Sequence, residues 1–317
     1  MPSKLDQLRT MTTIVADSSD LESIAVFKPT DSTTNPSLIY KAAQLPAYAH
    51  LFDDTIAWGR KAGASVEEVA DRLVIDFGAK LTQIVSGRVS TEVDATLSFD
   101  IAGTMAKARQ IIAAYAERGI GRERILVKVA STWEGAQAVA TLQREGIDCN
   151  MTLLFSLAQA AAAADAGAFL ISPFVGRILD WHVKAGGGPY TGETDPGVVS
   201  VKAIYAYYKA LGIKTVVMGA SFRNTGEIEA LAGCDRLTIA PDLLHKLADD
   251  NGPLTRKLSP ESVGPAPARI ALDEKRWRWM MNEDAMASDK LAEGIRVFTH
   301  DLAALRDLVS KRMAKAA

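Results

Sequence analysis

The chain has 317 residues, with 36 basic and 38 acidic side chains and a formal net charge of −2 at pH 7. Because both signs are interspersed along the chain, this balance argues against a nucleic-acid-binding surface, which needs a clustered basic excess. No apolar run approaches the ~18 residues that a membrane span requires, and residues 1–20 lack the apolar core of a signal peptide. We therefore expect a cytoplasmic protein with neither nucleic-acid nor membrane partners.

Eight short apolar runs alternate with helical patterns, which is typical of a parallel sheet covered by helices. The length also fits a large α/β domain. Eight such units predict a closed (β/α)8 TIM barrel of about 250 residues, with insertions making up the rest. The alternative is an open doubly wound sheet, but no G-x-G-x-x-G follows the first strand. The predicted strands are residues 12–17, 31–36, 88–94, 125–130, 149–155, 169–175, 215–222 and 236–241.

Helical segments fill the connections between these strands. One begins at Ser98, a candidate N-cap, and ends at Gly119; a second follows the same pattern from Ser131 to Gly146. Further helices extend the barrel, and we expect them to belong to one domain of residues 1–317. They are two insertions around 51–62 and 65–85 and a C-terminal extension of about 270–317 with a break near Asn282.

Cysteine and histidine usage indicates neither a disulfide framework nor a metal site. The two cysteines, Cys149 and Cys234, lie at or beside apolar strands, so we predict inert buried thiols. The histidines show no H-x-H or H-E-x-x-H spacing; they are His50, His182, His245 and His300. We expect no metal and no cofactor.

Polar residues occur near the carboxyl ends of seven predicted strands, where the active site of a TIM barrel lies. Taken singly, each has a structural explanation: a buried lysine pairs with a carboxylate, Asn before Pro starts a turn, and arginines lie on the surface. Their distribution over seven strands instead predicts one site. The candidates are Asp17, Asn35, Glu92, Lys128, Asn150, Thr152 and Ser172 on the strands, with Arg177, Ser221 and Arg223 just beyond them.

Lys128 stands in the middle of the apolar run "ILVKVA". A free lysine has a pKa of ~10.4, so about one in 2,500 is neutral at pH 7. Apolar surroundings disfavour the charged form, and a neutral amine attacks a carbonyl carbon to form a Schiff base. An ionised Asp17 or Glu92 nearby would favour the ammonium form, so the two effects oppose each other.

The other candidates supply what Schiff-base chemistry on a sugar phosphate needs. Carbinolamine dehydration and proton removal from a substrate hydroxyl require a positioned acid or base, and two carboxylates in different surroundings can divide these roles. Asn and Ser side chains can hold hydroxyl groups. The guanidinium forks of Arg177 and Arg223 suit a phosphate, with Ser221 as a further donor.

These residues lie in motifs that resemble the transaldolase family, whose members are class I Schiff-base enzymes. The motifs, in the expected order and over almost the whole chain, are "DSTTNPSLI", "VSTEVDATLSFD", "ILVKVASTWEG", "CNMTLLFS", "ISPFVGRILDW", "GASFRN" and "AGCDRLTIAP". The resemblance implies a barrel that is circularly permuted relative to other class I aldolases. It also implies a reactive lysine on the fourth strand, which matches Lys128.

The resemblance implies a function in the non-oxidative pentose phosphate pathway. A dihydroxyacetone unit would pass from sedoheptulose 7-phosphate to glyceraldehyde 3-phosphate, giving erythrose 4-phosphate and fructose 6-phosphate. Family members are commonly homodimers, so the C-terminal helices are candidates for an interface or, equally, for packing within the chain.

By the same resemblance each site residue receives a role. Asp17 would be the general acid/base at the cleaved bond, while Glu92 and Thr152 would hold a water that relays protons. The dihydroxyacetone unit would be bound by Asn35, Asn150 and Ser172, and Phe174 would form a wall of the site. The phosphate would be bound by Arg177, Ser221 and Arg223.

Four other functions remain as alternatives. A related fructose-6-phosphate aldolase would release free dihydroxyacetone, although Glu92 and Phe174 resemble the transaldolase choices. A metal-dependent enzyme lacks ligand spacing. A glycosidase could use Asp17 and Glu92 as its carboxylate pair, which leaves Lys128 without a purpose. A non-catalytic sugar-phosphate-binding barrel would form no covalent adduct.

Overall fold

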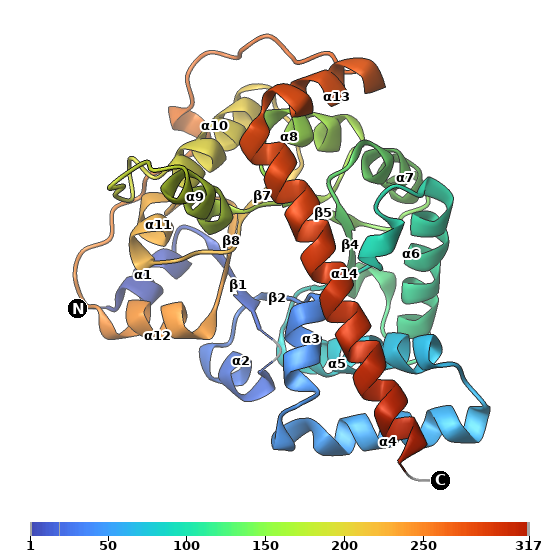
Figure 1. The fold of residues 1–317 in the computed structure, drawn as a ribbon. Helices are drawn as coiled ribbons and strands as arrows, with labels where there is room; N and C mark the ends of the chain where they lie inside the picture. The colour runs from blue at the N-terminus through green and yellow to red at the C-terminus, as the bar shows by residue number, and fades with distance from the viewer. Residues whose placement is uncertain (1, 19, 316–317) are drawn as a thin grey trace.

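Eight parallel strands close into a barrel in the computed structural model, which describes residues 2–18 and 20–315 (Figure 1). Each strand pairs with the next in the chain, and β1 pairs with β8. The strands are β1 (Thr13–Asp17), β2 (Asp31–Thr33), β3 (Val89–Glu92), β4 (Ile125–Ala130), β5 (Cys149–Leu154), β6 (Leu170–Pro173), β7 (Val216–Gly219) and β8 (Arg236–Ile239). The TIM barrel is confirmed and the open sheet is wrong; the circular permutation stays a prediction.

All eight strands lie where the sequence predicted them, but several end earlier than expected. The second strand ends at Thr33 because Asn35 caps a helix that has Pro36 at its first position. The eighth strand ends at Ile239 because a helix with Pro241 at its first position follows it. The seventh ends at Gly219, after which Ser221 adopts a left-handed backbone with φ 62°. These early ends place Asn35 and Ser221 in the short loops that follow β2 and β7.

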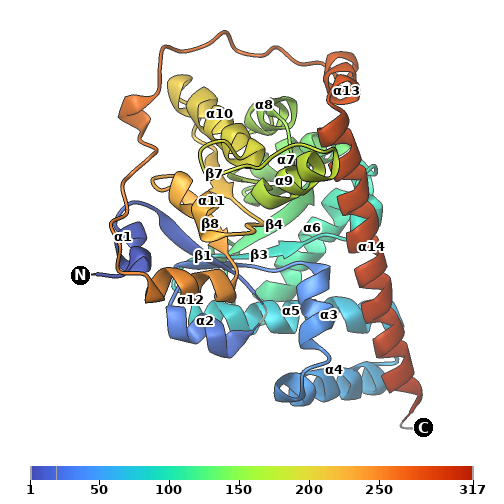
Figure 2. The ribbon, with the colours of Figure 1, turned by 60° about the vertical axis from the view of Figure 1, so that its left-hand side comes forward.

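Helices surround the barrel (Figures 1 and 2). They are α1 (Lys4–Arg9), α2 (Leu21–Phe27), α3 (Pro36–Ala42), α4 (Ala49–Ala62), α5 (Val66–Ile84), α6 (Ile101–Ala116), α7 (Trp133–Arg144), α8 (Leu157–Asp165), α9 (Val175–Lys184), α10 (Pro196–Ala210), α11 (Thr225–Ala230), α12 (Pro241–Asp249), α13 (Glu274–Glu283) and α14 (Ala285–Ala314). Short 3₁₀ turns are η1 (Pro46–Tyr48), η2 (Ala95–Leu97), η3 (Arg122–Arg124) and η4 (Pro260–Ser262). In the described part of the chain, no helix combines the length and apolarity that crossing a bilayer requires.

The two insertions between the second and third strands are confirmed as α4 and α5, but two predicted N-caps are wrong. Asp100 rather than Ser98 caps α6, because its carboxylate accepts the Gly103 N–H at 2.9 Å while the Ser98 hydroxyl donates to Ala95 O. Thr132 rather than Ser131 caps α7 through the Gly135 N–H. In each case the observed cap follows the predicted serine by one or two residues and directly precedes the first turn of the helix.

The C-terminal helix α14 covers the carboxyl end of the barrel. It crosses in front of the strands in Figure 1 and lies along one side of the molecule in Figure 2. It packs on β5 and on α3, α5 and α9. Gly294 permits this close approach, since a Cβ there would lie 2.6 Å from Leu153 Cδ2. The predicted break is confirmed, because Asp284 separates α13 from α14 and caps the latter.

The two cysteines are buried in the core, as predicted. Both thiols are free, and neither side chain is exposed to solvent. Burial raises the pKa of Cys149, and it raises the pKa of Cys234 to about 12. A thiol that stays protonated is a poor nucleophile, so these residues fill space within the barrel wall.

Candidate active site

Lys128 lies at the centre of the barrel on β4, a strand in which every residue is buried. The register of the sheet places Glu92 of β3 and Asn150 of β5 on its two sides. The ammonium nitrogen donates to Thr34 O at 3.3 Å and lies 3.3 Å from Glu92 Oε2. The amine is therefore enclosed by protein, and among the described residues its ion-pair partner is the Glu92 carboxylate.

Glu92 is a buried carboxyl group whose charge is only partly supported. Burial raises the pKa of Glu92, and the nearby Lys128 and Arg177 oppose that effect. Among the described residues, Thr152 Oγ1 is buried without a hydrogen-bond partner, and Glu92 Oε2 has its ion pair with Lys128 but no further partner. Buried polar atoms without partners are costly, by about 1–3 kcal/mol each. These two atoms are therefore suited to bind a water molecule or a substrate hydroxyl close to Lys128.

Asp17 ends β1 on the other side of the site. Burial raises the pKa of Asp17, against the opposing effects of Lys128, a Thr33 hydrogen bond and Arg177. The Thr33 hydroxyl lies 3.2 Å from Asp17 Oδ1 and 3.0 Å from the Thr238 hydroxyl. A carboxyl group with a raised pKa can exchange a proton nearer neutral pH than a solvated one.

Asn150 and Ser172 form a hydrogen-bonded chain inside the barrel. Ser172 Oγ donates to Asn150 Oδ1 at 2.7 Å, and Asn150 Nδ2 donates to Ser90 Oγ at 3.1 Å. Asn35 has a structural task as well, because its Oδ1 caps α3 by accepting the Leu38 N–H at 3.0 Å. Asn35 therefore starts a helix, as the structural explanation predicted, and also lines the site.

Arg177 points into the site from the first turn of α9. Its guanidinium carbon lies 4.9 Å from the Phe174 ring centre and 5.4 Å from that of Phe298 on α14. The pKa of Arg177 is lowered, first by burial and then by the neighbouring charge of Arg223. Two cations so close together suit a doubly charged anion.

Arg223 is already engaged by a carboxylate that the sequence did not suggest. Its Nη2 lies 2.7 Å from Asp180 Oδ2 on α9, and its Nη1 donates to the Ser221 hydroxyl at 3.3 Å. Gly176 makes this arrangement possible, since a Cβ there would lie 2.7 Å from Arg223 Cγ. Arg223 and Ser221 are therefore held together at the rim of the barrel.

A cavity of about 60 Å³ joins most of these groups. Of the predicted residues it is lined by Asp17, Asn35, Lys128, Ser172, Phe174, Arg177 and Ser221. Glu92, Asn150, Thr152 and Arg223 are not among the residues that line it. Sequence reasoning missed Thr33, Thr238 and Phe298, which also line it. Phe298 places its ring 6.0 Å from Lys128 Nζ, and its only sequence signal is an apolar position on an amphipathic helix.

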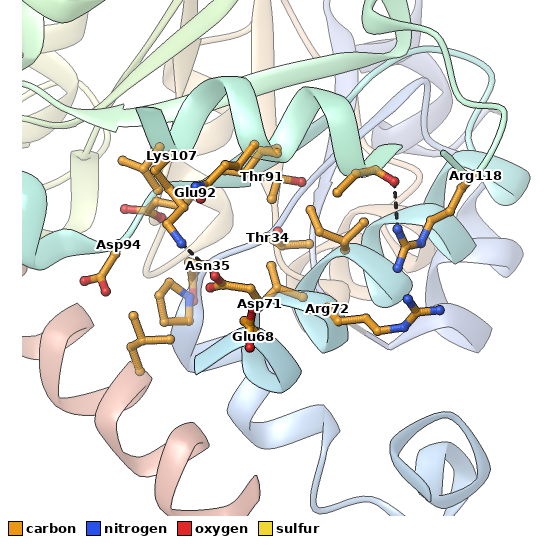
Figure 3. Close-up of a pocket in the computed structure, with 18 of the residues that line it drawn as sticks. Thr34, Asn35, Glu68, Asp71, Arg72, Thr91, Glu92, Asp94, Lys107 and Arg118 are labelled. Atoms are coloured by element: carbon orange, nitrogen blue, oxygen red, sulfur yellow. Dashed lines mark hydrogen bonds and ion pairs between the residues drawn. The ribbon is translucent and has the colours of Figure 1, made fainter. Parts of the chain in front are cut away.

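A larger cavity of about 220 Å³ lies beside the barrel, between α5, α6 and the end of β3 (Figure 3). It reaches the site only at Thr34, Asn35 and Glu92. The Lys107 ammonium and the Asp71 carboxylate join α6 to α5 there, 2.6 Å apart. Because Lys128, Asp17 and Arg177 do not line this cavity, we place the chemistry in the smaller one.

Comparison with known proteins shows the family of the chain. A family model described as Transaldolase/Fructose-6-phosphate aldolase matches residues 14–309. The chain belongs to the transaldolase/fructose-6-phosphate aldolase family. Curated relatives named transaldolase include those of Agrobacterium fabrum, 64% identical over all of both chains, and Rhizobium etli CFN 42, 62% identical over all of both chains. That of Shewanella amazonensis is 54% identical over 99% of this chain and all of its own.

The resemblance drawn from the motifs is thus confirmed, and the chain has enzymes as its relatives. Within the described residues no group of three or more His, Cys, Asp or Glu side chains is arranged to hold a metal ion. The roles of individual site residues stay predictions.

Proposed function

We propose that this chain is a transaldolase that carries a dihydroxyacetone unit on Lys128 as a Schiff base. The observation that carries the proposal is the enclosed amine on β4, 3.3 Å from Glu92 Oε2, in a chain whose relatives bear that name at 54–64% identity. The donor would be sedoheptulose 7-phosphate and the acceptor glyceraldehyde 3-phosphate. The products would be erythrose 4-phosphate and fructose 6-phosphate.

Covalent catalysis begins at the keto carbon of the donor. Neutral Lys128 Nζ adds to this carbon, and the resulting carbinolamine loses its hydroxyl as water to give an iminium ion. Glu92 supplies and accepts the protons of this dehydration through a water held with Thr152. Thr152 Oγ1 has no other partner among the described residues, and Glu92 Oε2, which pairs with Lys128, can accept from this water as well.

Carbon–carbon cleavage then needs a base at the substrate hydroxyl next to the bond that breaks. Asp17 takes that proton, the aldose leaves with its new carbonyl group, and the bonding electrons pass into the iminium to form an enamine. The enamine carbon attacks the second aldehyde, and Asp17 returns the proton to the new hydroxyl. Hydrolysis by the same water releases the product ketose, fructose 6-phosphate, and regenerates the amine.

Substrate binding is divided between the two ends of the site. Asn35, Asn150 and Ser172 bind the hydroxyl groups of the three-carbon unit, and Phe174 walls it. Arg177, Ser221 and Arg223 bind the phosphate; to do so Arg223 uses the N–H groups that its ion pair with Asp180 leaves available, because a guanidinium group has five donors.

The relatives' family also contains fructose-6-phosphate aldolase, and acceptor dependence separates the two activities. With fructose 6-phosphate alone, a transaldolase retains the three-carbon unit on the enzyme after one cleavage. Adding erythrose 4-phosphate should start turnover to sedoheptulose 7-phosphate. Steady release of free dihydroxyacetone without any acceptor would instead establish the aldolase.

A homodimer and a cytoplasmic location are also proposed for this chain. In the structure α14 packs on its own barrel, so only part of its surface remains available to a partner. Sedimentation velocity measures the mass of the protein in solution. A mass of twice 34.0 kDa would support the dimer, and a mass of 34.0 kDa would contradict it.

A further inference from the structure

A pair of buried carboxyl groups lies under the loop that carries Ser221 and Arg223. Glu227 of α11 is fully buried, and Asp195, which caps α10, is 2% exposed. The negative charge of Asp195 raises the pKa of Glu227, so the two carboxyl groups are close enough to interact. Two neighbouring buried carboxylates cannot both be ionised cheaply, so such a pair can share one proton.

Glu227 holds the backbone of Arg223. Its Oε2 accepts the Arg223 N–H at 2.7 Å, and its Oε1 accepts from Asn224 Nδ2 at 3.3 Å. Two residues earlier, Ser221 has a φ of 62°, a conformation that non-glycine residues adopt only when surrounding contacts impose it. Glu227 is therefore one of the contacts that fix this loop and the start of the Arg223 side chain.

Within this pair, the shared proton lies mainly on the carboxyl group of Glu227. Burial raises the pKa of Asp195 as well, but Asp195 accepts the N–H groups of Gly197 and Val198 at 2.7 and 3.2 Å, which opposes that rise. The pKa of Glu227 is raised to about 7, first by burial and also by the charge of Asp195, against the Arg223 N–H bond. The other charged or titratable groups nearby are Arg223 itself, its partner Asp180, and His182 on α9.

We propose that Glu227, sharing a proton with Asp195, positions Arg223 for the phosphate of the substrate, and that loss of this proton weakens phosphate binding. The inference rests on the phosphate role of Arg223 in the proposed function. Ionised Glu227 would repel Asp195 and loosen the loop, and it would place a further negative charge beneath the site of a phosphate dianion. Glu227 touches no substrate atom in this account, so it is a positioning residue.

The test compares Glu227→Gln with the wild-type protein between about pH 6.5 and about pH 8.5. We expect the KM of the wild type for fructose 6-phosphate to rise at least about threefold over this range, as a proton is lost near pH 7. In Glu227→Gln that rise should disappear, while kcat changes little. With unphosphorylated fructose as donor, kcat/KM should show no corresponding change in either protein.

Two further variants keep the test decisive. Glu229→Gln alters the same helix at a carboxylate that pairs with Lys4, away from the loop, and should keep the wild-type pH profile. Asp195→Asn retains a side chain that can cap α10 but removes the neighbouring charge, so it should move the rise in KM to lower pH. This second shift tests the inference even if Glu227→Gln folds poorly.

Retention of the wild-type profile in both Glu227→Gln and Asp195→Asn would overturn the inference. A failure of the proposed function would look different. Replacing Arg223 by Ala would then weaken phosphorylated and unphosphorylated donors equally, whatever the pH.

Discussion

Glu92 and Lys128 face each other on adjacent strands, with Oε2 and Nζ 3.3 Å apart and both side chains at most 5% exposed. Replacing Glu92 by Gln keeps the volume and removes the proton acceptor. We expect kcat to fall by about 10²- to 10⁴-fold, the usual contribution of a positioned acid or base. Steady-state kinetics measure this, with Glu145→Gln as a control at a surface carboxylate that pairs with Arg109. A wild-type kcat in Glu92→Gln would contradict the relay role.

Asp17→Asn should separate Schiff-base formation from bond cleavage. The amide cannot accept the proton of the substrate hydroxyl, so a donor ketose should become attached to Lys128 and remain intact. Mass spectrometry after borohydride reduction should show the mass of fructose 6-phosphate added to the chain instead of a three-carbon unit. A three-carbon adduct formed at the wild-type rate would show that another group is the base.

Arg223→Ala should weaken phosphorylated donors selectively. A charge-assisted hydrogen bond contributes about 1.5–3 kcal/mol, so kcat/KM for fructose 6-phosphate should fall by roughly 10- to 150-fold. With dihydroxyacetone as donor the change should be small. Arg269→Ala removes an exposed ion pair with Asp165 and serves as the control, which should leave both donors unaffected. Equal losses for both donors in Arg223→Ala would refute the phosphate assignment.

The raised pKa of Glu227 predicts a pH dependence of stability. The folded chain holds this proton up to about pH 7, whereas the ordinary pKa is 4.5. The folded state therefore binds more protons between these values, and its free energy of unfolding should decrease as the pH rises from 4.5 to about 7. Urea unfolding of wild type and Glu227→Gln should show this decrease only in the wild type. If the free energy of unfolding changed with pH in the same way in both proteins, the pKa of Glu227 would be the same in the folded and unfolded chain.

The sequence predicted the barrel and its polar residues because both follow from local patterns. Eight apolar runs specify the strands, and the fold itself brings their carboxyl ends together. Phe298 and Asp180 were not predicted. Phe298 reaches Lys128 from a helix at the far end of the chain, and no pattern in α14 tells which apolar residue covers the barrel. Asp180 is half-exposed on α9, so its ion pair with Arg223 depends on how the helix and the loop pack together.

The errors at strand ends and helix caps have a similar origin. Ser98 and Asp100 are both good N-caps by type, and the choice between them depends on the η2 turn that precedes α6. The interaction of Asp195 with Glu227 likewise joins the residue that caps α10 to a residue of α11. Contacts between distant segments decide these features, and a local pattern does not contain them.

Borohydride trapping tests the central claim most directly. Reduction of the enzyme in the presence of fructose 6-phosphate should add a three-carbon unit, and peptide mapping should find that unit on Lys128. The Lys128→Met variant should take up no adduct and lose turnover. An adduct on Lys184 or Lys214, or full turnover by Lys128→Met, would contradict the account.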